Sequence, residues 1–336
     1  QWVKALLYME QLQGQADEDI TRSRVYFEEE IRTAPLRVAA LLRSLEAEQL
    51  YFYLQQQRYR LSGRTEIQND TSEDISTWTS GRLNKKIREL FLGSLEKEEL
   101  LKQTDLASFD VIVLKGNVRN LRPTLYDMLV WRALLYFESD DPEQPLAEDA
   151  FMMNDPAVFL PGRQFMDYSF KGSGTASNHL TALKLFQSLL NFHAADAKPD
   201  AEIDADINRI GFVNRYAVMP EKDSLYFSAL QRITNEYPSL PAASQAWYLQ
   251  AALFSQKAAS FDPVKDTSGQ FEYVKAKAIC EQVLTQKDSS EGKTNCISLL
   301  QNINRKSFML ETEKVNLPDL PLRALVTYKN IDHVYG

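Results

Sequence analysis

Apolar residues recur with helical spacing through most of this 336-residue chain. Leu83, Ile87 and Leu90 share one face of a predicted helix, and similar stripes continue as far as Ile303. This spacing is typical of helices that bury one face against a core. Only 12 glycines are present, which disfavours a turn-rich β chain. The sequence therefore predicts an all-α body, with one of its helices at residues 17–33.

Two local patterns in the first half are less regular. Asp74 or Ser76 is expected to cap the helix that contains Leu83. Residues 108–114 (SFDVIVL) form either a short strand or a buried turn of helix, because short apolar runs do not separate the two by periodicity.

Three similar helical starts recur in the second half. They lie at Ala182, Ala229 and Ala278, about 47 to 49 residues apart, and a second helical pattern follows each one. Tetratricopeptide units are helical hairpins that repeat at about 34 residues. Hairpins of this kind stack side by side into an α-solenoid with a continuous core. We therefore predict an irregular, tetratricopeptide-like α-solenoid of stacked helical hairpins for residues 1–306.

A stretch rich in Pro, Asp and Gly interrupts this body and marks an internal boundary. Its aromatic residues predict an ordered excursion that packs onto the helices. The predicted organisation is N-terminal hairpins at 1–138, the excursion at 139–176, tetratricopeptide-like hairpins at 177–306 and a β segment at 307–336.

The β segment differs in pattern from everything before it. After two prolines, apolar residues alternate with their neighbours at Leu322, Ala324, Val326 and Tyr328. This period of two is typical of a half-buried strand. Because a lone strand or hairpin is marginally stable in water, we expect the opening of a β domain that belongs to a larger protein.

The apolar face of this segment needs a cover. Disorder, pairing with a neighbouring molecule and docking onto the helices are the three possibilities. We expect docking, in a groove of the last helical hairpin near Ile297 and Leu300, with frayed ends.

Charge and hydropathy exclude some partners. The net charge is −8 and the basic residues are dispersed, so the footprint of a nucleic-acid-binding face is missing. The basic stretch at 82–86, with Arg88, is interpreted as a solvated helix face. The sequence contains no run of eighteen apolar residues, so it predicts no membrane-spanning helix. No signal peptide is visible, although Gln1 falls inside a helical pattern, which leaves the natural amino terminus open.

The histidines do not predict a site. His179 and His193 lie at the two ends of one predicted helix, about 21 Å apart, and His333 belongs to the β segment. No HExxH or CxxC motif is present, and the carboxylates lie on runs typical of solvated helix faces. We therefore predict no catalytic residue, no cofactor and no metal, and we expect the isolated chain not to be an enzyme.

Three short motifs have simpler interpretations than their chemistry suggests. Residues 291–294 (EGKT) imitate the end of a phosphate-binding loop, but Lys287 stands where that loop needs glycine, so we interpret them as a polar turn. Cys280 and Cys296 lie on consecutive predicted helices, and buried thiols are favoured over a disulfide. Asn69 begins a formal glycosylation sequon that decides nothing.

Residues 317–335 (LPDLPLRALVTYKNIDHVY) resemble the opening of the first macroglobulin-like β-sandwich in bacterial alpha-2-macroglobulin-like proteins. The helical body is similar to the region that precedes that sandwich in one branch of the family. The stretches 122–127, 206–213 and 221–226, together with 229–230, carry this similarity.

The resemblance implies a large extracytoplasmic protein, in the periplasm or anchored at the outer membrane, whose relatives trap proteases by changing conformation. This chain would be a non-catalytic helical accessory domain. Its partners would be the other domains of the same larger chain, and also envelope proteins or target proteases. The family's bait region and thioester lie downstream of the first sandwich, so no functional residue carries over.

A second hypothesis comes from another class. Helical-repeat lipoproteins of the outer membrane that take up glycans use exposed aromatic residues, and here Trp78, Trp131 and Trp247 are the candidates. The β segment does not fit that class.

Overall fold

The computed structural model describes residues 17–61, 63–64, 72–116, 118–139, 151–170, 177–262, 265–287, 289–315, 321 and 323–335. The helical pattern around Gln1, the sequon at Asn69, parts of the 139–176 excursion, and Leu322 lie outside these residues. The chain divides into two compact units, Gln1–Pro220 and Glu221–Gly336.

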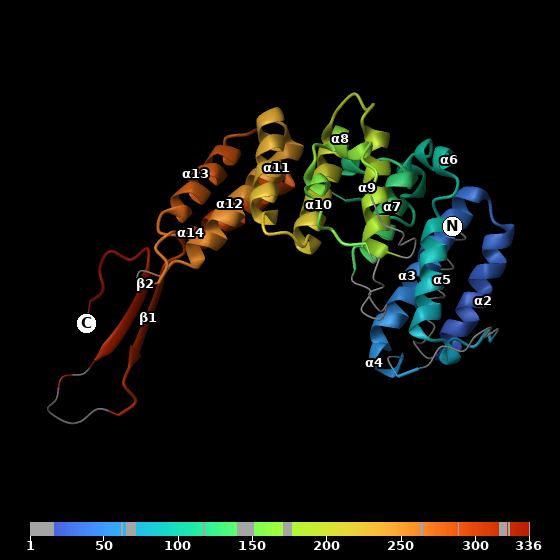
Figure 1. Ribbon diagram of the computed structural model, residues 1–336, viewed down its shortest axis with the longest axis horizontal. Coiled ribbons are helices and arrows are strands. Elements are labelled where there is room, and N and C mark those ends of the chain that lie inside the picture. The colour runs from blue at the N-terminus through green and yellow to red at the C-terminus, as the bar shows by residue number, and fades with distance from the viewer. Residues whose placement is uncertain are drawn as a thin grey trace. The chain divides into compact units, whose positions relative to one another are not determined.

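The described residues are mostly helical, with one short antiparallel sheet of two strands (Figure 1). This confirms the predicted helical body and the β segment at the carboxyl end.

The first unit holds nine of the described α-helices. They are α2 (Asp17–Thr33), α3 (Leu36–Gln56), α4 (Arg58–Leu61), α5 (Ser80–Gly93), α6 (Glu98–Lys102), α7 (Leu125–Phe137), α8 (Gly162–Met166), α9 (Asn178–His193) and α10 (Asp200–Tyr216). Short 3-10 turns join them at η1 (Ile75–Thr77), η2 (Leu106–Phe109), η3 (Arg119–Leu121) and η4 (Pro156–Phe159).

The helices of the first unit pack along the chain order. Helix α3 lies against α2 and α5, and α9 lies against α7, α8 and α10. Side-chain caps fix several helix starts: Thr79 caps α5, Ser177 caps α9, and Thr124 forms a capping box with Asp127 at α7. These caps satisfy backbone N–H groups that a helix start leaves without partners.

Two local predictions in this unit were wrong. Asp74 caps the short turn η1, and Thr79 caps α5, because the chain makes an extra turn before the helix begins. Residues 108–114 form neither a strand nor a buried helical turn. Ser108 and Phe109 end η2, and 110–114 follow as turns that are exposed or half-buried, with Leu114 97% exposed, since their backbone bonds locally instead of to another strand.

The second unit contains four described α-helices followed by the sheet. Its elements are α11 (Lys222–Glu236), α12 (Ser244–Ala259), α13 (Glu272–Leu284), α14 (Glu291–Asn304), β1 (Ser307–Thr312) and β2 (Ala324–Lys329), with a 3-10 turn η5 (Pro241–Ala243) before α12. Helix α12 packs against α11, α13 and α14, and α13 packs against α14. Larger, partly buried side chains such as Trp247, Phe254 and Leu299 pack against the buried core of the last three helices, which consists of Ala251, Ala276, Cys280, Val283, Cys296 and Ile303.

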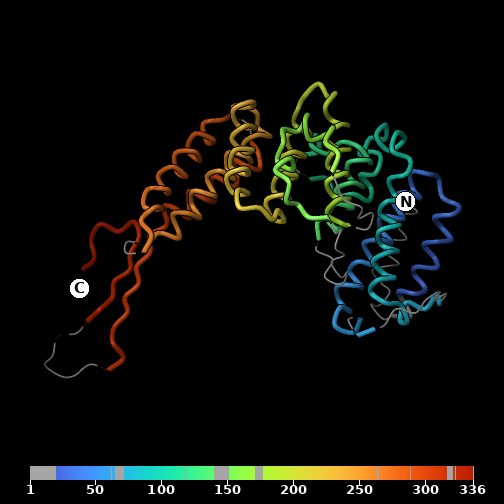
Figure 2. Tube along the Cα trace, in the orientation of Figure 1, coloured from blue at the N-terminus to red at the C-terminus, as the bar shows by residue number. Residues whose placement is uncertain are grey.

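Strands β1 and β2 form an antiparallel hairpin that leaves the end of α14 (Figures 1 and 2). Phe308 pairs with Tyr328, and Leu310 pairs with Val326. The expected docking onto the last helical hairpin was wrong for the strand residues, since Ala324, Val326 and Tyr328 are all exposed. The strand at β2 was predicted correctly. Its backbone groups hydrogen-bond to a second strand, β1, which the prediction did not include.

Candidate functional site

The most distinctive surface of the described chain is one side of the terminal hairpin. Residues directly opposite in an antiparallel pair share a face, and so do alternate residues along a strand. The register therefore gathers four large apolar side chains, with Thr312 and Ala324 at the far end of the same side. We call the four the hairpin face: Phe308, Leu310, Val326 and Tyr328.

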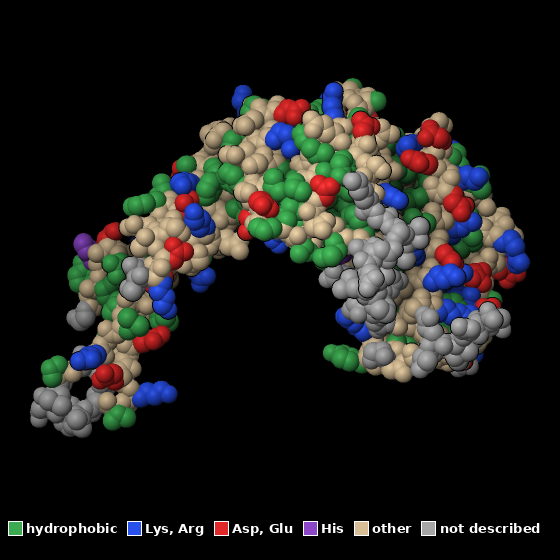
Figure 3. All heavy atoms as spheres, viewed as in Figure 1, with side chains coloured by type: hydrophobic (Ala, Val, Ile, Leu, Met, Phe, Trp, Pro, Cys, Tyr) green, Lys and Arg blue, Asp and Glu red, His purple; other side chains and the backbone are tan. Residues whose placement is uncertain are grey.

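The hairpin face is open to solvent. Its four side chains are between 43% and 63% exposed. The space-filling view shows apolar side chains at the surface along the hairpin, interspersed with charged ones (Figure 3). The other side of the hairpin is mixed, with Glu311, Thr327 and Lys329 beside Met309 and Leu325. Only one side therefore has the composition of a surface made to be covered.

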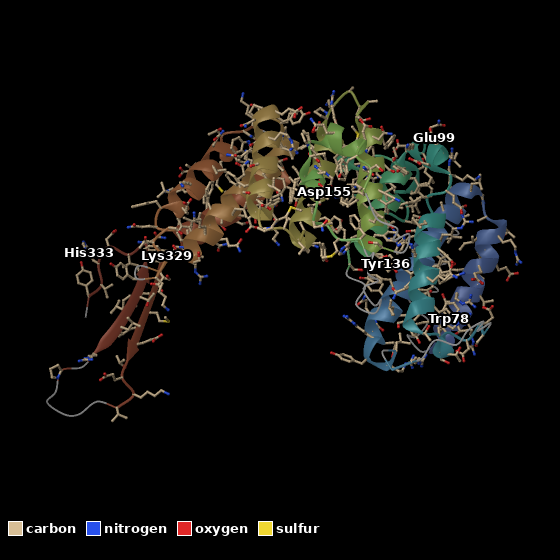
Figure 4. The ribbon with its side chains drawn as sticks, viewed as in Figure 1. Trp78, Glu99, Tyr136, Asp155, Lys329 and His333 are labelled. Atoms are coloured by element: carbon tan, nitrogen blue, oxygen red, sulfur yellow. The ribbon has the colours of Figure 1, made fainter. Side chains whose placement is uncertain are left out.

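The base of the hairpin is fixed to the last helix. The Asn330 side-chain amide donates to the carbonyl oxygens of Ile303 (2.7 Å) and Arg305 (3.2 Å). Lys329 Nζ donates to the Asn302 carbonyl at 3.1 Å and lies 4.6 Å from the centre of the Tyr273 ring (Figure 4). Carbonyl groups at a helix end lack partners within the helix, so these contacts satisfy the end of α14 and hold the strands at a defined origin.

Both outer edges of the hairpin are also open in the described residues, because the sheet has only two strands. Each edge offers backbone N–H and C=O groups for a further strand. An open apolar face and open edges on an anchored base suit the recognition of another sheet.

The three histidines of the sequence lie in three separate places. His179 packs against the rings of Phe212 and Tyr216, and His333 is exposed beyond β2. His193 is buried and links two helices: Nε2 bonds Asp127 of α7 at 2.8 Å, and Nδ1 bonds Asp196 at 2.7 Å. The structure does not bring them together.

The pair of carboxylates favours the charged form of His193. Burial of the ring opposes the charge, but the hydrogen bonds and negative charges of Asp127 and Asp196 outweigh it and raise the pKa of His193 above its ordinary value. Both ring nitrogens are engaged and the residue is only 2% exposed. A general base needs a ring nitrogen that reaches substrate, so this arrangement serves to clamp α9 to α7.

The tryptophans do not form open platforms. Trp78 is buried, its indole N–H donates to the Ser72 carbonyl, and the guanidinium of Arg82 stacks on its ring at 4.2 Å. Trp131 and Trp247 are half-buried, and Arg122 covers the ring of Trp131 at 3.9 Å. None of the three tryptophans is therefore fully exposed.

The basic stretch near Arg88 was wrongly interpreted as a solvated face. Lys86 forms an ion pair with Glu28 of α2 at 2.7 Å, and Arg88 donates to Asn178 and Thr181 of α9. These side chains, like Arg82, connect α5 to other elements.

The phosphate-loop imitation at 291–294 is the first turn of α14, not a turn between helices. Ser290 caps this helix, and its hydroxyl bonds that of Ser244 at 2.6 Å. A Cβ added to Gly292 would lie 2.2 Å from the Ser244 backbone, so the glycine permits the close crossing of α12 and α14.

The structure also reveals a buried acid that sequence reasoning missed. Glu46 of α3 is fully buried, and neither carboxylate oxygen has a hydrogen-bond partner among the described residues. Burial, with a smaller contribution from Glu28, raises the pKa of Glu46 to about 7 although Lys86 and Arg24 oppose the increase. Its place between Leu42 and Leu50 on one helical stripe was the available signal.

No group of three or more His, Cys, Asp or Glu side chains in the described part of the chain could hold a metal ion. No described helix has the length and apolar character needed to cross a bilayer. The chain matches no protein-family model, no curated protein and no solved structure.

Proposed function

We propose that this chain is a non-catalytic helical scaffold that presents the hairpin face to a β-sandwich. The observation that carries the proposal is the exposure of Phe308, Leu310, Val326 and Tyr328 on one side of an anchored hairpin. Covering a half-exposed apolar side chain contributes about 1 kcal/mol, so a partner that covers all four gains several kcal/mol.

A second sheet layer is the partner of matching chemistry. Sheets in a β-sandwich pack about 10 Å apart with interdigitating apolar inner faces. The hairpin supplies one such inner face together with open edges for further strands. Helices could cover the same face, but they would not use the edges.

We further propose that the scaffold is an irregular tetratricopeptide-like α-solenoid. The packing of consecutive helices supports it: α9 with α10, α11 with α12, and α13 with α14. In a solenoid each hairpin contacts its neighbours, and the last hairpin offers a stable origin for whatever follows. Helix α14 has that position relative to β1.

The resemblance at residues 317–335 suggests the biological setting. On this proposal the chain is the accessory domain of an extracytoplasmic alpha-2-macroglobulin-like protein that inhibits proteases in the cell envelope. Its main partner is the macroglobulin-like sandwich of the same larger chain.

A binding measurement tests this proposal. The polypeptide encoded directly downstream in the gene is produced separately, and its affinity for the chain is measured by calorimetry. Val326→Lys, in the hairpin face, should weaken binding at least about tenfold, which corresponds to about 1.4 kcal/mol. Thr327→Lys adds the same charge on the opposite side and should change it little.

Two results would contradict different parts of the proposal. Binding that is equally sensitive to both variants, or no binding, would rule out the hairpin face as the recognition surface. A reading frame that encodes no β-sandwich downstream would remove the alpha-2-macroglobulin setting.

A further inference from the structure

The two cysteines face each other inside the second unit. Cys280 of α13 and Cys296 of α14 are both free thiols, and neither has any exposed surface. Their side chains hydrogen-bond to each other. A disulfide requires two Cβ atoms that point toward one another at short range, and two thiols in hydrogen-bond contact satisfy the first part of this requirement.

The surroundings leave each sulfur with the other as its reaction partner. The packed neighbours in this core are apolar, among them Ala251, Ala276 and Val283. The described residues place no third metal-ligating side chain beside the pair, and two thiolates alone do not complete a tetrahedral zinc site.

We propose that Cys280 and Cys296 are a reversible dithiol–disulfide pair that links α13 to α14. This inference does not rest on the proposed function, because it concerns the chemistry of the two thiols alone.

The exchange takes two steps. The thiolate, not the thiol, is the nucleophile, and either cysteine can ionise once the helices open. When Cys280 attacks oxidised glutathione, which is the oxidant, it forms a mixed disulfide and releases one glutathione thiol.

Cys296 then completes the exchange. It loses its proton and attacks the Cys280 sulfur of the mixed disulfide, which releases the second glutathione thiol. Two protein thiols have lost two electrons and two protons, and one glutathione disulfide has become two thiols. Because both sulfurs are buried in the native fold, the reaction requires opening of α13 and α14 or proceeds during folding.

The link would also affect the hairpin. Ile303 belongs to the same apolar core as both cysteines, and its carbonyl accepts the Asn330 bond at the hairpin base. A disulfide between α13 and α14 therefore restricts the helix to which the hairpin is attached.

The experiment refolds the full chain from denaturant in buffers of reduced and oxidised glutathione. Free thiols are then alkylated, and the protein is digested and analysed by mass spectrometry. We expect a peptide linked through Cys280 and Cys296, and a melting temperature at least about 4 °C higher than that of the reduced chain. Cys280→Ala and Cys296→Ala should each abolish the link and the difference between the two buffers.

Three outcomes would overturn the proposal. Both cysteines could be recovered alkylated after refolding in excess oxidised glutathione, or only as separate glutathione adducts. Alternatively, the linked chain could melt at a lower temperature than the reduced chain, because the bond then distorts the helices instead of linking them. The linked peptide is sought in the unmodified chain, so the result does not depend on whether the variants fold.

Discussion

Replacing Glu46 by glutamine should stabilise the protein at alkaline pH and have little effect in acid. Glu46 is fully buried, and neither of its carboxylate oxygens has a hydrogen-bond partner among the described residues. The nearby cations are already paired: Lys86 bonds Glu28 at 2.7 Å, and Arg24 bonds the same carboxylate at 2.8 Å. A negative charge on Glu46 is therefore poorly compensated.

The magnitude follows from the pKa. Burial raises the pKa of Glu46 from 4.5 to about 7, and this difference corresponds to about 3 kcal/mol. The folded state binds the proton more tightly than the unfolded state. The stability that it contributes is complete below pH 4.5 and is lost as the pH rises to about 7. Glutamine keeps the shape of the protonated acid and cannot ionise.

Urea denaturation of both proteins at pH 4.5 and at pH 8 measures the effect. Glu46→Gln should differ little from the unmodified chain at pH 4.5 and should be more stable by about 3 kcal/mol at pH 8. Glu48→Gln is the matched control, since it removes a carboxylate of the same helix that is paired with Arg132. It should cost less than about 1 kcal/mol. A variant that is no more stable at pH 8 than at pH 4.5, relative to the unmodified chain, would refute the reasoning.

Three further predictions test the packing and the buried charges. Gly292→Ala should destabilise the fold by more than about 2 kcal/mol in urea denaturation, because its Cβ meets the Ser244 backbone. Gly211→Ala is the control, since its Cβ meets no atom within 4 Å, and it should be neutral or stabilising. Equal effects of the two variants would contradict this packing. Arg209→Met should cost about 3 kcal/mol or more, because the buried guanidinium bonds Asp206 and the Leu160 carbonyl; a loss below about 1 kcal/mol in the same assay would be inconsistent with that role. His193→Gln should cost more stability at pH 6 than at pH 9. The raised pKa of His193 contributes stability below about pH 6.5, and this contribution is lost as the pH rises through the pKa of the folded state. A loss of stability that is the same at both pH values would contradict the role of His193 as a charged link between α9 and α7.

Long helices with clear apolar stripes were predictable from the sequence. Helix α2 was expected at 17–33 and spans Asp17–Thr33. The helical starts predicted at Ala182, Ala229 and Ala278 lie within α9, α11 and α13, and a second helix follows each one, because apolar residues at helical spacing reflect the burial that forms those helices. The β segment was recognised by its period of two.

The pairing of the strands and the partners of the buried polar side chains were not predictable in the same way. Strand β1 carries the alternation of Phe308 and Leu310, but the sequence does not say which second strand meets it. Periodicity places Glu46 with Leu42 and Leu50 on the apolar stripe of its helix, but it does not show which partners a buried polar side chain finds, such as Asp127 for His193. The burial of Trp78 depends partly on a distant segment, since the guanidinium of Arg24 in α2 lies over its ring at 5.1 Å.

Hydrogen exchange measures whether another sheet covers the hairpin. The backbone amides of 307–312 and 324–329 are compared in this chain alone, as a monomer, and in the complete product of its gene. We expect fast exchange of these amides in the chain alone, while the core helices α13 and α14 stay protected, and strong protection of both strands in the complete protein. Strands that are as protected as α13 in the isolated monomer, or that remain unprotected in the complete protein, would contradict the claim that the hairpin face exists to be covered by another sheet.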